Sequence, residues 1–286
     1  MANYPSVGTV QAELTRQGAS WAAADNPISR LSEPERVLRL GVNPGIGDPT
    51  IYQVEQAPAA AAVAGAAAGA PSAFDLRNIN GKNYVTAIRD QANCGSCVAF
   101  GSLATIEGSI AWNQKTENPQ LDLSEAHLFY CYGKPEDVTC ATGWMPSRAL
   151  VHCATGIVDE ACFPYHAGDQ QCSLCADWQK RMTKIRSSTD LTGNVAGMKN
   201  WISTYGAVAG CFIVYDDFFH YRSGVYRHIT GDRAGGHCIS IVGYDDTQSC
   251  WICKNSWNTT WGEQGFFRIA YGECGMETWQ VLGVSV

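Results

Sequence analysis

The stretch QANCGSCVAF, residues 91–100, decides the fold of this 286-residue chain. A turn that contains Gly95 leads into a run in which apolar residues recur at helical spacing, so we expect a buried helix that begins at Cys97. A thiolate is a far better nucleophile than a thiol, and the dipole and free N–H groups of a helix N-terminus stabilise it. Cys97 is therefore the candidate nucleophile.

A thiol nucleophile needs a base, and histidine is the residue whose ordinary pKa lies closest to neutrality. Of the six histidines, only His237 opens a predicted strand directly after a glycine pair, Gly235-Gly236. Glycine lets another backbone approach closely, which suits a site beside a cleft. His237 is therefore the candidate proton partner of Cys97.

The periodicity of the sequence changes beyond Gly206. The first half predicts helices at residues 97–115, 124–130 and 141–155. The second half holds short runs rich in β-branched and aromatic residues, which predict strands at 208–215, 237–244, 250–257 and 265–271. We therefore expect an α+β protein with a helical lobe, a β-rich lobe and a cleft where they meet.

Composition excludes several classes of protein. The net charge of −7 argues against a nucleic-acid binder, which would carry a clustered basic surface. No window holds the roughly 18 apolar residues of a membrane-spanning helix. Hydrophobic residues make up 45% of the chain, which favours a compact globular protein. We expect a monomer that binds neither nucleic acid nor membrane.

Three sequence blocks carry a resemblance to a known family. QANCGSC (91–97) resembles the active-site segment of papain-like cysteine peptidases, and GHCISIVGYDD (236–246) and KNSWNTTWGEQGFFRI (254–269) resemble the histidine and asparagine segments of that family. His237 lies about 140 residues after Cys97, which matches the family spacing. The resemblance covers about residues 74–286 and implies the papain-like two-lobed fold, with a helical left lobe and a β-rich right lobe.

The resemblance also implies a role for each residue of the site. Cys97 would be the nucleophile and His237 its proton partner. Asn255 would orient the imidazole, and Trp257 would shield that hydrogen bond from water. Gln91 would donate its side-chain amide to the oxyanion, beside the backbone N–H of Cys97.

Two segments depart from the family pattern. Val98 stands where an aromatic residue is expected after the nucleophile, so one wall of the cleft is smaller. The segment that resembles the family's Gly-rich substrate-binding loop, residues 140–146, has one extra residue and a single glycine. Trp279 takes the position of the floor of the main specificity pocket and implies a shallow pocket. The implied substrate-binding residues are Gly143, Trp144, Met145, Pro146, Cys211, Gly236 and Trp279.

The 13 cysteines all lie between Cys94 and Cys274, and their odd number leaves at least one thiol unpaired. By resemblance, Cys94 pairs with Cys140, and Cys131 pairs with Cys172 or Cys175; the other connections stay open. Cys-x-x-Cys pairs also suggest a redox or zinc reading, but the pairs at 172–175 and 250–253 are too far apart for a typical zinc module. We expect no metal and no cofactor. Cysteine usage favours an extracytoplasmic compartment, although the sequence shows no signal peptide.

Residues 1–72 differ from the rest because they lack cysteine and end in an Ala/Gly-rich run at 58–71, which we interpret as a linker. Ser32 and Glu35 form a capping box that predicts a helix of about two turns, with Gly41 as its C-terminal cap. Asn43-Pro44-Gly45 predicts a looping passage over a surface. We expect a peptidase domain at 73–286 and, before it, a propeptide-like segment that covers the cleft.

The sequence therefore predicts a cysteine endopeptidase precursor that hydrolyses peptide or protein substrates through a thioester. Two alternatives remain open at this point. One is an inactive binding or regulatory protein with the peptidase fold, which the changes at Val98 and in the Gly-rich segment favour. The other is a transferase or amidase that uses the same thiol chemistry.

Overall fold

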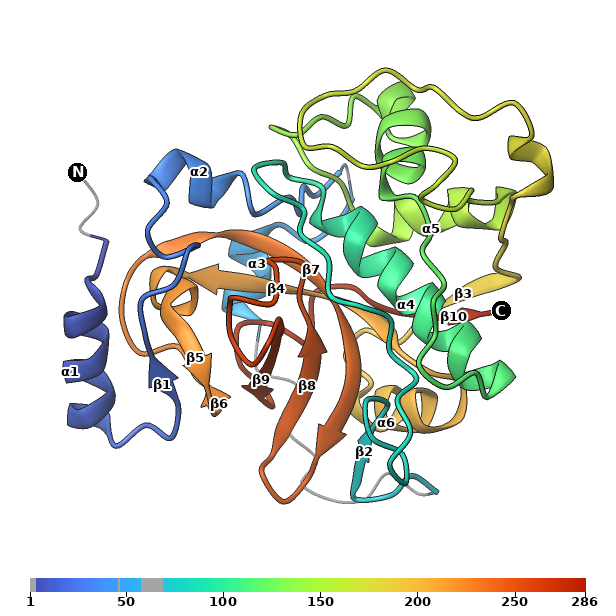
Figure 1. The fold of residues 1–286 in the computed structure, drawn as a ribbon. Helices are drawn as coiled ribbons and strands as arrows, with labels where there is room; N and C mark the ends of the chain where they lie inside the picture. Colours follow the sequence, from blue (N-terminus) through green and yellow to red (C-terminus); the bar gives the residue numbers. More distant parts are fainter. Residues whose placement is uncertain (1–3, 46, 58–68) are drawn as a thin grey trace.

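The computed structural model describes residues 4–45, 47–57 and 69–286 (Figure 1). Its helices are α1 (Val7–Gln17), α2 (Glu33–Val37), α3 (Ile51–Gln56), α4 (Cys97–Gln114), α5 (Pro146–Thr155) and α6 (Val195–Thr204), with short helical turns η1 (His127–Tyr132), η2 (Lys134–Glu136), η3 (Trp178–Lys180) and η4 (Asp216–His220). Its strands are β1 (Ala22–Ala23), β2 (Ala73–Asp75), β3 (Ser187–Asp190), β4 (Val208–Tyr215), β5 (Tyr221–Ser223), β6 (Val225–Tyr226), β7 (Arg233–Asp245), β8 (Cys250–Lys254), β9 (Phe266–Ala270) and β10 (Val281–Ser285).

One large sheet forms the β-rich part of the molecule, with the order β3-β10-β4-β7-β8-β9-β6 and with β2 added on β7. The central strands are antiparallel, and Phe212 of β4 lies opposite His237 of β7. β4 is buried along nearly all of its length, which explains why its sequence is apolar without alternation. The four predicted strands are present with two differences in bounds. β7 begins at Arg233, so His237 lies inside the strand and does not open it, and β8 ends at Lys254 rather than at residue 257.

Helix α4 lies along β7 and carries Cys97 at its first position (Figure 1). The two elements pack closely because Gly101 has no side chain: a Cβ there would lie 2.9 Å from the sulfur of Cys238. Most residues of α4 are buried, so the predicted buried helix is confirmed. It ends where Lys115 adopts a left-handed conformation with φ of 55°.

The other two predicted helices of this lobe are present with different bounds. Ser124 caps the first, since its hydroxyl accepts a hydrogen bond from His127 N at 2.9 Å, but the segment continues as a π-helical turn to Tyr132. The second begins only at Pro146, because the chain before it turns at Gly143, which has φ of 72°. Proline suits the first turn of a helix, where its missing N–H costs no hydrogen bond.

The described residues form two large apolar cores, one in each lobe, and a smaller third cluster around Leu76 and Val242. The helical lobe packs α4, η1 and α5 around buried residues that include Leu103, Phe129 and Leu150. The β-rich lobe has an aromatic core that includes Phe212, Phe218, Tyr226, Trp257, Trp261 and Phe267. The expected division into a helical and a β-rich lobe is confirmed. Among the helices that the structure describes, none has the length and apolar character to cross a membrane.

The N-terminal segment docks on the β-rich lobe. Strand β1 pairs with β5, and the indole N–H of Trp21 donates to the carbonyl of Arg227 at 2.9 Å. Val10 and Leu14 of α1 are buried in the aromatic core. The sequence interpretation missed α1, although Ser6 caps its start and Gly18, with φ of 63°, ends it.

Helix α2 has the predicted capping box, in which Ser32 N donates to the carboxylate of Glu35 at 2.9 Å. The helix ends at Val37, so the prediction that Gly41 caps it is wrong; Gly41 continues in extended form toward Cys97. Helix α3, capped by Thr50 and Gln53, was not predicted. Of the predicted linker at 58–71, residues 58–68 lie outside the described residues.

Candidate active site

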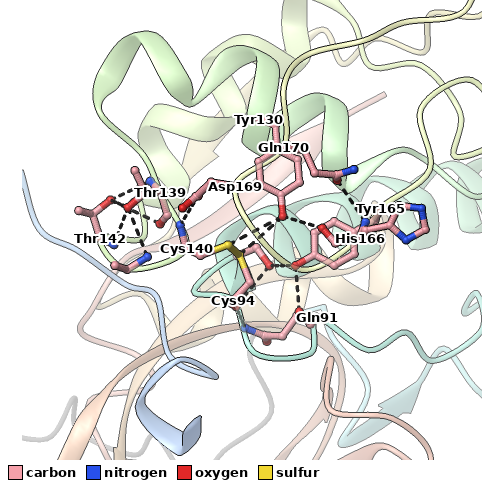
Figure 2. Close-up of a disulfide and its surroundings, with 12 residues drawn as sticks. Gln91, Cys94, Tyr130, Thr139, Cys140, Thr142, Tyr165, His166, Asp169 and Gln170 are labelled. Carbon is pink, nitrogen blue, oxygen red and sulfur yellow. Dashed lines mark hydrogen bonds between the residues drawn. A yellow bond between two sulfur atoms is a disulfide. The ribbon is translucent and has the colours of Figure 1, made fainter. Parts of the chain in front are cut away.

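Cys97 is held by the turn that precedes α4. Gly95 N donates to the carbonyl of Cys140 at 2.8 Å, and the Cys94–Cys140 disulfide ties the same two loops together. Figure 2 shows how the hydroxyl of Tyr165 lies over this turn. It donates to the carbonyl of Gln91 at 2.9 Å and lies 2.7 Å from the hydroxyl oxygen of Ser96. The turn is therefore fixed by a covalent bond and by several hydrogen bonds.

The imidazole of His237 faces Asn255, which follows β8 directly. Its Nε2 lies 2.8 Å from Asn255 Oδ1, which also accepts from Ser256 N, so Nε2 donates and Nδ1 is left as the basic nitrogen. Nδ1 is buried and has no hydrogen-bond partner among the described residues. The Trp257 ring lies 4.7 Å from the imidazole, centroid to centroid, and covers the His237–Asn255 pair.

Gln91 lies beside the nucleophile with its amide oriented by two contacts. Its Nε2 donates to the carbonyl of Cys94 at 2.9 Å, and its Oε1 accepts from the hydroxyl of Ser256 at 2.7 Å. Because Nε2 carries two hydrogens, one remains for a bound oxyanion. The sequence interpretation missed Ser256 and Tyr165. Ser256 could have been found from its place next to Asn255, whereas nothing in the sequence around Tyr165 points to the site.

Burial controls the electrostatics of the site in this form. It raises the pKa of the Cys97 thiol, as does the neighbouring Cys238, although the N–H groups of Cys238, Gly41 and Val98 act in the opposite direction. Burial also lowers the pKa of His237 to about 4, despite the hydrogen bond to Asn255. The thiol and the imidazole are therefore both neutral near neutral pH. The expected thiolate stabilisation by the helix N-terminus is outweighed here by the loss of water.

The chain around Gly41 lies in extended form directly on this site. Gly41 N and Val42 N both approach the carbonyl of Gly236, at 3.1 and 3.2 Å. On the other side, Trp144 N donates to the carbonyl of Gly41 at 2.8 Å, and Asn43 N donates to the carbonyl of Trp144 at 2.9 Å, as in a parallel β-bridge. The main chain of residues 41–43 is thus clamped from both walls of the cleft.

Two glycines make this close approach possible. A Cβ on Gly41 would overlap the carbonyl of Gly95, and a Cβ on Gly143 would overlap the carbonyl of Gly41. Arg39 anchors the same segment, with its Nη1 2.5 Å from Asp90 Oδ1 and its Nε 3.2 Å from Asn93 Oδ1. The segment therefore runs through the cleft at residues 41–43, and the predicted looping passage over the surface begins at Asn43.

The predicted specificity pocket lies beside Val42. A Cβ on Gly236 would collide with the Trp279 ring and lie 2.9 Å from Val42 Cβ, so the three residues meet at one point. Trp279 is buried, and its indole N–H donates to the carbonyl of Pro49 at 3.1 Å. Cys211 lies opposite Cys238 on the neighbouring strand, in the same apolar cluster as Trp279.

The remaining predicted substrate residues, Met145 and Pro146, are buried at the start of α5, directly after Trp144. Both belong to the helix start and extend the wall that Trp144 forms. Sequence reasoning did not find Gly41, because it was assigned to a helix end, nor Glu136, which contacts the indole of Trp144 at 3.0 Å.

Three disulfides are present among the described residues, and all lie in the helical lobe. They join Cys94 to Cys140, Cys131 to Cys172, and Cys162 to Cys175. Cys97 is left as a free thiol, so Cys94 and Cys97 do not form a redox pair. Cys172 and Cys175 are bonded elsewhere, which removes the zinc alternative at these positions.

Comparison with known proteins gives a consistent assignment. The profile described as papain family cysteine protease matches residues 70–284. "Cathepsin B-like CP3" of Giardia intestinalis is 34% identical over 226 residues, which cover 75% of this chain and 74% of that protein. "Cathepsin B-like cysteine proteinase 2" of Haemonchus contortus is 30% identical over 251 residues, with 75% and 73% covered.

Solved structures show the same fold over nearly the whole chain. ProCathepsin B S9 from Trypanosoma congolense superposes with a TM-score of 0.79 at 23% identity and covers 99% of both chains. Digestive procathepsin L 3 of Tenebrio molitor superposes with a TM-score of 0.76 at 24% identity and covers 98% of this chain and 88% of that chain. The papain-like two-lobed fold expected from the sequence is thereby confirmed.

Proposed function

Because this chain belongs to the papain family of cysteine proteases, we propose that Cys97, His237 and Asn255 hydrolyse peptide bonds within protein substrates, and that residues 1–72 hold the enzyme as a precursor. The observation that carries the precursor proposal is the clamped main chain at Gly41. Its N–H donates to the carbonyl of Gly236, its carbonyl accepts from Trp144 N, and it lies against Gly95 in the turn that carries Cys97. A substrate needs the same space, so the two exclude each other.

The chemistry uses the Cys97 thiol and the His237 imidazole together. His237 Nδ1 takes the thiol proton as Cys97 Sγ attacks the scissile carbonyl, and the imidazolium then gives this proton to the leaving amine. The acyl group remains on sulfur as a thioester. Water next attacks the thioester with His237 as base, which releases the carboxylic acid and restores the thiol.

The tetrahedral intermediates carry a negative oxygen that needs donors. The free hydrogen of Gln91 Nε2 and the N–H of Cys97 supply two, and Ser256 keeps the Gln91 amide in its orientation. Removing one donor of this kind typically costs about 2.7–4 kcal/mol in the transition state. Asn255 keeps the imidazole in one tautomer, and Trp257 keeps water from their hydrogen bond.

The test uses the folded chain, cut by a site-specific protease whose recognition sequence replaces part of residues 58–68. We expect the cut protein to hydrolyse a fluorogenic peptide, and we expect Cys97→Ala, cut in the same way, to be inactive. The products should be the free acid and the amine, even when an amine acceptor is present. A cut protein whose Cys97 reacts with a peptidyl epoxide but which hydrolyses no peptide contradicts the proposal, and transfer to the acceptor favours the transferase alternative.

A further inference from the structure

Trp144 has two separate roles in the structure. Its main chain clamps the extended segment at Gly41 and Asn43 from one side of the cleft. Its side chain is fully buried in the core of the helical lobe, and its indole N–H donates to Glu136 Oε2 at 3.0 Å. We call the main-chain N–H and carbonyl of Trp144 the clamp. Its position is linked through the indole to the carboxylate of Glu136.

Glu136 is itself held by a histidine and an arginine. Its Oε1 lies 2.7 Å from His152 Nε2, and its Oε2 lies 2.6 Å from Arg148 Nη2. The His152 ring packs against the Trp144 indole with centroids 5.6 Å apart. His152 and Arg148 both belong to α5, so Glu136 joins the wall at Trp144 to the body of that helix.

The carboxylate stays ionised over a wide range of pH. Partial burial acts to raise the pKa of Glu136, but the hydrogen bonds from His152 and Trp144 and the charge of Arg148 outweigh it, and the pKa is lowered. A hydrogen bond to an ionised acceptor is roughly twice as strong as a neutral one. Glu136 therefore holds the indole N–H with a charge-assisted bond.

We propose that Glu136 is a positioning residue for substrate binding: through the indole of Trp144 it fixes the main-chain clamp that binds the extended backbone of the substrate. This inference rests on the proposed function, since it assumes that a substrate pairs with Trp144 as residues 41–43 do. Glu136 itself contacts no reacting atom. Its loss should weaken the binding of extended peptides and leave the chemistry at Cys97 intact.

The prediction separates two kinds of substrate. An extended peptide forms the hydrogen bonds to Trp144, whereas an amino-acid ester with no peptide bond on its amino side ends before the clamp. We expect Glu136→Ala to lower kcat/KM for the extended peptide about tenfold, mainly through KM. For the ester, we expect a change of less than about twofold.

The experiment uses the enzyme cut after folding, with active sites counted by a peptidyl epoxide. Four variants are compared with the parent: Glu136→Ala, Glu136→Gln, Trp144→Phe and the double variant Glu136→Ala/Trp144→Phe. Glu136→Gln keeps an acceptor for the indole and should recover part of the loss. Glu117→Gln is the control, because Glu117 forms an exposed ion pair with Lys82 far along the chain from the clamp.

Trp144→Phe removes the indole N–H and keeps an aromatic ring. If Glu136 acts through that N–H, kcat/KM for the peptide should fall no further in the double variant than in the weaker of the two single variants. Equal losses on peptide and ester, no loss on the peptide, or additive losses in the double variant each overturn the inference. A parent that cleaves neither substrate contradicts the proposed function instead.

Discussion

The main-chain N–H of Gly41 donates to the carbonyl of Gly236 at 3.1 Å, next to the candidate base His237. Gly41 lies in the N-terminal segment and Gly236 in the central strand of the β-rich lobe. The contact therefore joins the N-terminal segment to the β-rich lobe at the active site. The first two predictions below follow from this contact.

Gly41→Ala tests the close approach directly. A Cβ at this position would overlap the carbonyl of Gly95, so the segment cannot keep its place over Cys97. We expect the uncut full-length variant to hydrolyse peptides faster than the uncut parent, by about tenfold or more. Gly8→Ala is the matched control, because a Cβ there meets only Ser6 Oγ at 3.8 Å. Unchanged latency in Gly41→Ala would show that another segment blocks the site.

Arg39→Ala tests the anchor of the same segment. The Arg39 side chain is buried, but its partner Asp90 is about one third exposed, so the ion pair contributes less than a fully buried one. We expect a loss of roughly 1–2 kcal/mol in docking, which raises the activity of the uncut chain about five- to thirtyfold. Arg16→Ala removes an exposed ion pair with Glu13 and should change nothing. Equal activity in the two variants argues against the anchor.

Stability should depend on pH through His237. Its pKa is about 4 in the folded protein and about 6.5 when unfolded, so the unfolded chain binds more protons between these values. The free energy of unfolding should therefore fall by about 3 kcal/mol as the pH drops from about 7 to 4. Well below pH 4 the imidazole is protonated in both states, so His237 adds no further pH dependence there. Chemical denaturation of Cys97→Ala across this range gives the slope. The double variant with His237→Gln isolates the contribution, and identical slopes in the two proteins contradict the prediction.

Trp279 should set the size of the accepted side chain. Its ring meets Gly236 and Val42 at one point, so little room remains beyond a valine-sized group. We expect the cut parent to prefer valine over phenylalanine at the substrate residue whose side chain takes the place of Val42. Trp279→Leu should reverse this preference. The ratio of kcat/KM for two peptides measures this independently of the folded fraction. A preference that stays the same in the variant places the pocket elsewhere.

The sequence predicted the elements that are buried and regular. Strand β4 and helix α4 were found because long runs of apolar residues must be buried in a core. The three family blocks pointed to Cys97, His237 and Asn255, and the structure brings His237 and Asn255 within 2.8 Å. Their catalytic roles remain predictions, as does the boundary at residue 72.

The path of the N-terminal segment could not be predicted from local sequence. Helix α1 buries mainly Val10 and Leu14, too few apolar residues for a clear helical pattern. Gly41 was interpreted as a helix cap because glycine serves both there and at close backbone contacts. Its role in a close backbone contact becomes visible only from its neighbours Gly95 and Gly143, which are distant in sequence. The role proposed for Glu136 has the same origin, since its partners Trp144 and His152 lie 8 and 16 residues further along the chain.

The most direct test of the account is the rate at which a peptidyl epoxide labels Cys97 before and after the chain is cut within residues 58–68. Cys97→Ala serves as the blank, and mass analysis identifies the labelled thiol. If residues 41–43 occupy the cleft, labelling should be slow in the uncut chain and at least about tenfold faster once the segment has been cut and removed. Equal rates before and after removal would contradict the claim that the N-terminal segment holds the enzyme inactive.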